Sequence, residues 1–205
     1  MLNLSNINGL LSLNKQEIID QSYIKETVIF NIKQILLNQN RSWIFEEIEG
    51  TSLVPNELIN PEYTEEDYFK IDDKLSLKPE TTALSYAYAH QLLHHSIRAP
   101  LCVYQASKSF RKEQDQATKH MRLKEFKQLE FQCIYSNTTK NDYQLSTVEP
   151  IANFVKNLLR LNTRIVLSDR LPSYSIKTID IEVDNGEKWM EICSISIRND
   201  FDSNH

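Results

Sequence analysis

Two segments near the middle of the chain, residues 101–113 and 122–133, place arginines, an aromatic ring and carboxylates at alternating positions. Both segments read as β-strands, joined by a polar loop at residues 114–119. Because side chains alternate between the two faces of a strand, Arg111 and Glu113 share one face of the first strand. One face of the second strand carries Arg122, Lys124, Phe126, Gln128, Glu130 and Gln132.

This face has the chemistry that a nucleotide requires. A guanidinium pairs with phosphate, an aromatic ring stacks on a base, and a carboxylate binds an ammonium group. The opposite face of the second strand is mainly apolar, with Leu123, Leu129, Phe131 and Cys133. Alternation alone also fits an antiparallel sheet whose polar outer face is simply solvated, so the pattern leaves both interpretations open.

The order of these residues resembles motif 2 of the class II aminoacyl-tRNA synthetases, most closely the glycyl-tRNA synthetases. In that family the pattern is Q-x-G-K-S-F-R-N-E, then a loop, then R-x-R-E-F-x-Q-x-E. The matching residues are Gln105, Lys108, Ser109, Phe110, Arg111, Glu113, Arg122, Glu125, Phe126, Gln128 and Glu130. So many positions at fixed spacing are more specific than one short motif. The motif 2-like region spans residues 101–132.

Apolar residues at helical spacing predict one amphipathic helix, or two in series, over residues 15–38, followed by a strand at 43–48 and by Pro55. This order resembles motif 1 of the same family, over residues 25–55, which forms the dimer interface there. The resemblance therefore implies a homodimer through residues 15–55. An ordinary helix packed on a sheet would have the same pattern.

The segment Leu77-Lys-Pro-Glu-Thr81 resembles L-R-P-E-T of the glycyl enzymes, with Lys78 in place of arginine. A helix is predicted to follow over residues 81–97. Pro79 and a threonine hydroxyl are typical of a helix start, which explains the segment without any function but does not require Glu80. The acidic residues between 61 and 73 indicate an exposed loop.

The C-terminal part contains T-I-D-I-E at residues 178–182 and W-M-E-I-C-S-I-S-I-R at 189–198. Both resemble the family's T-D-I-E and G-W-x-E-x-x-G-I-A-x-R, with Ser194 in place of a glycine. Residues 188–198 are predicted to form the last core strand, buried, in which Glu191 would need a partner. Before it we expect a short strand at 142–147, a helix at 150–161 and a strand at 164–167.

The resemblance implies a role for each matched residue. Arg111 and Glu191 would be catalytic, with Arg111 holding the α-phosphate of ATP and the carboxylate of the amino acid. ATP would be bound by Arg111, Glu113, Arg122, Phe126 and Glu191, and Glu191 would also hold Mg²⁺, which prefers oxygen ligands. The amino acid, with glycine favoured, would be surrounded by Glu80, Gln128, Glu130 and Arg198.

The expected fold is α+β, an antiparallel β-sheet flanked by helices, as in the class II synthetase core. Residues 1–205 are expected to form a single domain that ends before the strand and helix of motif 3 and before any anticodon-binding domain. The resemblance would leave the motif 3 edge of the sheet open to a second chain. The formal net charge of −5 speaks against a broad basic surface for nucleic acid, although a local patch and tRNA binding stay open.

Three widely spaced cysteines lack metal-ligand spacing and are expected to be reduced thiols. With no long apolar segment and no leader-like segment, we expect a cytoplasmic protein with no membrane partner. Three functions stay open. In the first, the chain is an ATP-dependent amino-acid ligase completed by a partner. In the second, it is a non-catalytic paralogue acting as an accessory subunit, as in the accessory subunit of mitochondrial DNA polymerase. In the third, it is a regulator that binds ATP or an amino acid.

Overall fold

The computed structural model describes residues 9–95, 98–112, 122–136, 142–169, 171 and 175–198. The chain forms two compact units. The first consists of Met1–Thr27 and Ile44–Ile134, and the second of Val28–Trp43 and Tyr135–His205. Helix α1 (Lys15–Gln39) begins in the first unit and ends in the second, and its bounds confirm the predicted N-terminal helix.

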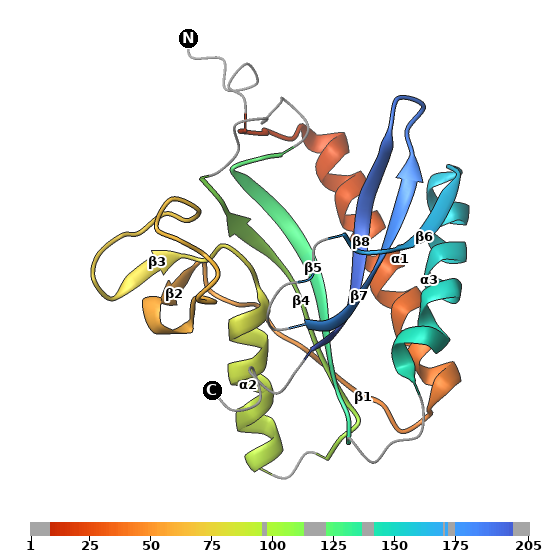
Figure 1. The fold of residues 1–205 in the computed structure, drawn as a ribbon, viewed down its shortest axis with the longest axis horizontal. Helices are drawn as coiled ribbons and strands as arrows, with labels where there is room; N and C mark the ends of the chain where they lie inside the picture. Colours follow the sequence, from red (N-terminus) through yellow and green to blue (C-terminus); the bar gives the residue numbers. More distant parts are fainter. Residues whose placement is uncertain are drawn as a thin grey trace. The chain divides into compact units, whose positions relative to one another are not determined.

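The first unit is built on a three-stranded sheet with the order β1-β4-β5, visible in Figure 1. Strand β1 (Ile44–Glu47) pairs in parallel with β4 (Leu101–Phe110), and β4 pairs in antiparallel with β5 (Glu125–Ile134). The β4–β5 hairpin confirms the two predicted central strands. The predicted loop at residues 114–119 lies outside the described residues.

Helix α2 (Thr82–His94) covers part of the polar face of this hairpin. Ala89 of α2 forms a buried apolar cluster with Leu101 and Val103 of β4. Val103 and Gln105 are two residues apart and therefore share a face, and Gln105 is completely buried. The interpretation of this face as a solvated outer surface is therefore wrong around Gln105, because the start of α2 lies over it.

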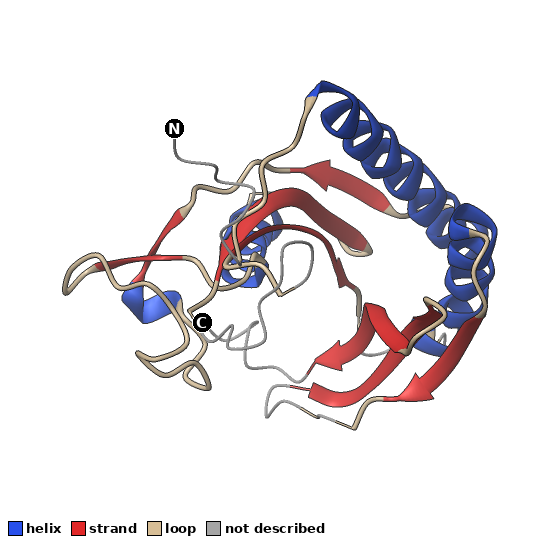
Figure 2. Cartoon of the chain, turned by 90° about the horizontal axis from the view of Figure 1, so that it is seen from above, coloured by secondary structure: helices blue, strands red, loops and turns tan. Residues whose placement is uncertain are grey.

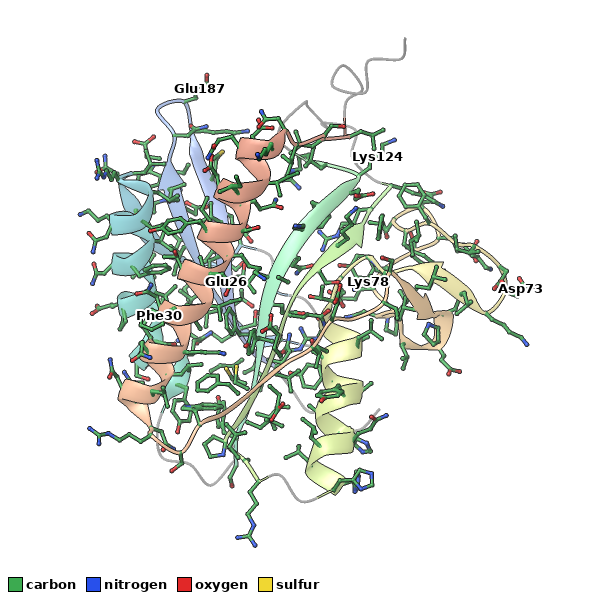
Figure 3. The ribbon with its side chains drawn as sticks, turned by 180° about the vertical axis from the view of Figure 1, so that it is seen from behind. Glu26, Phe30, Asp73, Lys78, Lys124 and Glu187 are labelled. Carbon is green, nitrogen blue, oxygen red and sulfur yellow. The ribbon has the colours of Figure 1, made fainter. Side chains whose placement is uncertain are left out.

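A second, small sheet joins β2 (Leu53–Pro55) and β3 (Leu75–Leu77) in antiparallel, with a 3-10 helix (Asn56–Leu58) after β2. The acidic segment 61–73 lies between these strands, and most of its carboxylate-bearing residues are exposed, as predicted. Asp73 lies at the tip of the turn before β3 (Figure 3). The backbone N–H of Lys112 donates to Asp67 O (2.8 Å), which ties this segment to the end of β4.

The second unit is an antiparallel sheet of β6 (Thr163–Leu167), β7 (Ser175–Asp184) and β8 (Trp189–Arg198), shown side by side in Figure 2. Helix α3 (Tyr143–Leu159) packs against all three strands. Gln144 of α3 donates from Nε2 to the backbone oxygen of Ile195 in β8 (2.7 Å) and to that of Lys177 in β7 (3.2 Å). Glu187 lies at the tip of the β7–β8 hairpin (Figure 3).

The predicted strand at 142–147 is wrong, because α3 already begins at Tyr143. Asp142 caps the helix, because its Oδ1 accepts a hydrogen bond from Leu145 N–H (3.0 Å). The helix therefore starts seven residues before Pro150. Pro150 lies inside the helix and has no N–H to offer the carbonyl four residues earlier, that of Ser146. Gln39 supplies the missing donor, because its Nε2 lies 3.2 Å from Ser146 O.

The last strand is where predicted but is not a buried strand. The described residues of β8 are exposed or half-buried, and Glu191 is exposed. β8 is at the end of the three-stranded sheet, so its outer flank is not covered by a further strand of that sheet. The expected burial cost of the Glu191 carboxylate is therefore absent.

The fold class agrees with the prediction, since sheets that are mainly antiparallel are flanked by helices in each unit. Among the described residues, no helix is both long enough and apolar enough to cross a membrane.

Candidate functional site

Glu130 is a carboxylate that accepts hydrogen bonds from two hydroxyl groups in the first unit. It lies on β5 opposite Gln105, and the start of α2 brings two hydroxyls to it. The hydroxyl of Thr82 donates to Glu130 Oε1 (2.6 Å), and that of Thr81 donates to Oε2. Both threonines are almost fully buried. The start of α2 therefore fixes the position of the Glu130 side chain.

Lys78 is a buried cation next to this carboxylate. Its side chain is 1% exposed, and Nζ donates to Ser107 Oγ (2.6 Å) and to the backbone oxygen of Gly50 (3.2 Å). The backbone of Lys78 is held on both sides, by Ser52 O and by Phe110 N–H. Burial lowers the pKa of Lys78 from 10.5 to about 8, and the negative charge of Glu130 opposes this change. Figure 3 shows Lys78 near the N-terminal end of α2.

Gly50 is required for this close packing. A Cβ atom at position 50 would lie 2.6 Å from Gln105 Oε1 and 3.1 Å from a methyl carbon of Leu84. The amide nitrogen of Gln105 is held in turn by Thr81 O (2.9 Å) and Ser85 Oγ (2.7 Å). The polar face of the hairpin is therefore an interlocked network rather than a set of solvated side chains.

Arg111 follows β4 and anchors a second cluster. Its Nε donates to Pro79 O (3.0 Å) and its Nη2 to the hydroxyl of Tyr63 (3.1 Å). That hydroxyl in turn donates to Glu80 Oε2 (3.4 Å). The guanidinium carbon lies 5.3 Å from the centre of the Phe126 ring and 5.7 Å from that of Tyr63. Two aromatic rings and two hydrogen bonds therefore orient the guanidinium.

The remaining predicted site residues of the first unit lie on β5 or in the segments next to the β4–β5 hairpin. Gln128 accepts from Ser109 Oγ at Oε1 (3.0 Å), and Phe126 is opposite Ser109 in the strand register. Arg122 is exposed and has a positive φ of 55°. Glu113, predicted to contact the base of ATP, lies outside the described residues.

Glu191 and Arg198 belong to the second unit. On its sheet, Ser194 Oγ lies 2.7 Å from Asp180 Oδ1 and 2.8 Å from Glu191 Oε1. Ser194, which the resemblance matches to a family glycine, adds a hydroxyl as the third oxygen-bearing group beside the two carboxylates. This donor set fits Mg²⁺, which prefers oxygen ligands. Among the described residues, no group of three or more His, Cys, Asp or Glu side chains is arranged as a metal site. Arg198 is half-buried at the end of β8.

Sequence reasoning missed Tyr63 and undervalued Thr81 and Thr82. Tyr63 lies in the acidic segment, and no motif or periodicity singles it out. The sequence indicates the threonines only as a helix start, yet their hydroxyls donate to the carboxylate of Glu130 on β5. For Lys78, the replacement of a family arginine was the one available signal.

Comparison with known proteins identifies the family of the chain. The family model described as "tRNA synthetases class II core domain (F)" matches residues 10–200. The glycine–tRNA ligase of Mycoplasma capricolum subsp. capricolum is 32% identical over 133 residues, which are 62% of this chain and 29% of that protein. The glycine–tRNA ligase of Mycoplasmopsis synoviae is 30% identical over 141 residues, which are 64% of this chain and 31% of that protein.

The chain thus spans less than a third of the length of these relatives. The match of the family model, in contrast, covers most of the chain, including both strands of the central hairpin and nearly all of the second unit. Over residues 10–200 the chain belongs to the family of class II tRNA synthetase core domains, and it is similar to glycine–tRNA ligases.

Proposed function

We propose that this chain is a synthetase-like domain that binds either ATP with glycine or the glycyl-adenylate formed from them. The observation that carries the proposal is the oriented guanidinium of Arg111, with Phe126 beside it and Glu80 linked to it through Tyr63. A guanidinium next to an aromatic ring is suited to a phosphate and an adenine that belong to one ligand.

Glu130 and Glu80 supply the complement for the amino group. Glu130 already accepts two hydroxyl hydrogen bonds, which hold an acceptor-only carboxylate in one place. A fixed carboxylate binds an ammonium group without first losing side-chain freedom. Gln128 lies on the same face of β5 and is the next residue proposed to contact the amino acid. Arg198, which the resemblance implies for the same role, belongs to the second unit.

The proposed reaction is amino-acid adenylation. A carboxylate oxygen of glycine attacks the α-phosphorus of ATP, a new P–O bond forms, and the bond to pyrophosphate breaks. Arg111 would stabilise the negative charge that builds up on the α-phosphate oxygens. No covalent bond to the protein is needed, so the contribution of these residues would be position and charge.

Glu191, with Asp180 and Ser194, would hold Mg²⁺ in this proposal. When bound, the ion would neutralise charge on the phosphate oxygens. The contribution of the chain is a pair of carboxylates, the exposed one of Glu191 and the buried one of Asp180, that share one hydroxyl partner. Asp180→Asn with Glu191→Gln should therefore remove the Mg²⁺ dependence of ATP binding.

The binding step can be tested by calorimetry with ATP and with a non-hydrolysable glycyl-adenylate analogue. Arg111→Ala should weaken binding about tenfold or more, since a hydrogen bond to a charged group is worth about 1.5–3 kcal/mol. Lys127→Ala is the matched control, because Lys127 is an exposed cation that directly follows Phe126 in β5. If the wild-type protein binds neither ligand, or if Arg111→Ala binds as tightly, the site is wrong.

Pyrophosphate exchange separates an enzyme from a binding domain. Glycine-dependent exchange of pyrophosphate into ATP would support adenylation, whereas binding without exchange would support a non-catalytic paralogue or a ligand-binding regulator. The relatives are named as tRNA ligases, and tRNA is for this chain a proposed partner only. Titration of wild-type protein with tRNA at two salt concentrations tests it.

A homodimer through residues 15–55 is the proposed assembly. Support comes from the first part of α1, where Ile18 (53% exposed), Ile19 (50%) and Tyr23 (69%) leave apolar surface uncovered. Sedimentation should show a dimer that Ile19→Lys dissociates. A monomer at high protein concentration would contradict this proposal.

A further inference from the structure

The last two turns of α2 bring two imidazoles together. His90 and His94 are four residues apart and so lie on one face of the helix, and both are exposed. Their Nε2 atoms are 3.1 Å apart. The ring centres lie 4.3 Å apart with 69° between the ring planes. Neither residue takes part in the candidate site described above.

The separation of the two nitrogens matches that of a metal chelate. With a metal–nitrogen bond of about 2.0–2.1 Å, two ligand atoms 3.1 Å apart subtend an angle of about 98° at the metal. This angle lies between square-planar and tetrahedral values. We propose that His90 and His94 form a bidentate site for a transition-metal ion, with Zn²⁺ as the representative ion.

The chemistry of the two ligands limits which ion binds. Neutral imidazole is a ligand for Zn²⁺, Cu²⁺ and Ni²⁺, whereas Mg²⁺ and Ca²⁺ prefer oxygen, so the site is distinct in kind from the proposed Mg²⁺ ligands. Both histidines lie near the C-terminal end of α2, where the helix dipole favours a cation.

The sequence around the pair indicates binding rather than hydrolysis. Zinc metalloproteases carry H-E-x-x-H on a helix, in which the glutamate is the general base. Here the residue after His90 is Gln91, which cannot accept a proton in that role. In the described part of the chain no third His, Cys, Asp or Glu joins the pair, so water completes the coordination and exchange of the ion is fast.

The alternative is a hydrogen bond between the two imidazoles, in which one Nε2–H donates to the other Nε2. That arrangement needs no ion, and it also fits a separation of 3.1 Å. The two interpretations differ in their response to metal, because only the chelate gains stability from an ion that binds the folded state.

The test is a calorimetric titration of the full chain with Zn²⁺, with no affinity tag on the protein and the cysteines kept reduced. His90→Gln and His94→Gln should each weaken binding about tenfold or more, because removing even an outer-shell partner of a ligand costs as much. His95→Gln is the matched control. His95 follows the helix as its C-cap residue, and its substitution should change the affinity less than about twofold.

Glutamine favours helices, so circular dichroism should show intact α2 in all three variants. Thermal unfolding gives a second readout, in which Zn²⁺ raises the Tm of the wild-type protein and of His95→Gln but not that of the other two variants. The proposal is overturned if wild-type protein does not bind Zn²⁺. It is also overturned if His90→Gln or His94→Gln binds like wild type, since the ion then lies elsewhere, for example at a thiol.

Discussion

The buried ammonium group of Lys78 should make the stability of this protein depend on pH within one defined window. Burial lowers the pKa of Lys78 in the folded state from 10.5 to about 8. The difference of about 2.5 pH units, at about 1.4 kcal/mol each, corresponds to about 3.5 kcal/mol. This is the amount by which the charge on Lys78 destabilises the folded protein at neutral pH.

The direction follows from proton binding. Below pH 8 both states carry the proton, so the cost of the buried charge is fully present. Between pH 8 and 10.5 the unfolded chain keeps a proton that the folded protein has released. Unfolding then takes up a proton, so the free energy of unfolding rises with pH across this window. Above pH 10.5 both states are neutral at Lys78 and the gain is complete.

Lys78→Met isolates this contribution, because methionine fills similar space and does not titrate. The variant also loses the hydrogen bonds to Ser107 and Gly50, each worth about 0.5–1.5 kcal/mol at any pH in this range. At neutral pH the two effects oppose each other, and wild type and variant should be similar or the variant slightly more stable. By pH 10.5 wild type should have gained about 3 kcal/mol relative to the variant.

The assay is urea unfolding followed by circular dichroism, at pH steps between about 7 and 10.5, for wild type, Lys78→Met and Lys74→Met. Lys74 is exposed and controls for the loss of one surface cation. The informative quantity is the difference between wild type and variant, because other groups that titrate in this range cancel in it. A difference for Lys78→Met that stays constant to within about 0.5 kcal/mol would show that Nζ is hydrated, and the reasoning from burial would fail.

Substitutions at three further positions test the packing in the two units, each measured by the free energy of unfolding in urea. Gly50→Ala should destabilise by about 1–3 kcal/mol, because the added methyl would lie 2.6 Å from Gln105 Oε1, and an unchanged stability would show that the network opens easily. Gln39→Ala should lower the free energy of unfolding by about 1 kcal/mol, since Ser146 O then loses its donor. Gln39→Glu keeps the side-chain length but offers no N–H, so it should cause a similar loss. Asp142→Ala should cost about 1 kcal/mol through the lost helix cap and Asp142→Asn much less, and equal losses in both would contradict a capping role.

Much of the fold was predictable because the signals are local. Alternation of polar and apolar residues over ten positions defines β4 and β5 and the face that carries Phe126, Gln128 and Glu130. Helical spacing of apolar residues defines α1 to within one residue at its end. These patterns depend only on the period of a strand or a helix, so they can be read without knowing what packs against them. The order of residues along the hairpin was likewise sufficient to indicate the family.

The errors arose where a non-local contact decides the outcome. In the sequence, Pro150 fits the first position of a helix. In the structure α3 continues through Pro150, because the side-chain amide of Gln39 donates to the carbonyl of Ser146 that Pro150 cannot serve. The sequence of β8 is apolar enough for a buried strand, yet its place at the end of a sheet leaves Glu191 exposed.

The sequence by itself determined the periodic elements, the pairing of β4 with β5 and the residue types available for binding. Only the tertiary structure decided which of these residues meet. Tyr63 reaches Arg111 and Thr82 reaches Glu130, although 48 positions in the sequence separate the two members of each pair. Thr81 also reaches Glu130. The physical reason is that a hydrogen bond depends on distance and direction in space, which segments far apart in the chain acquire only when they pack.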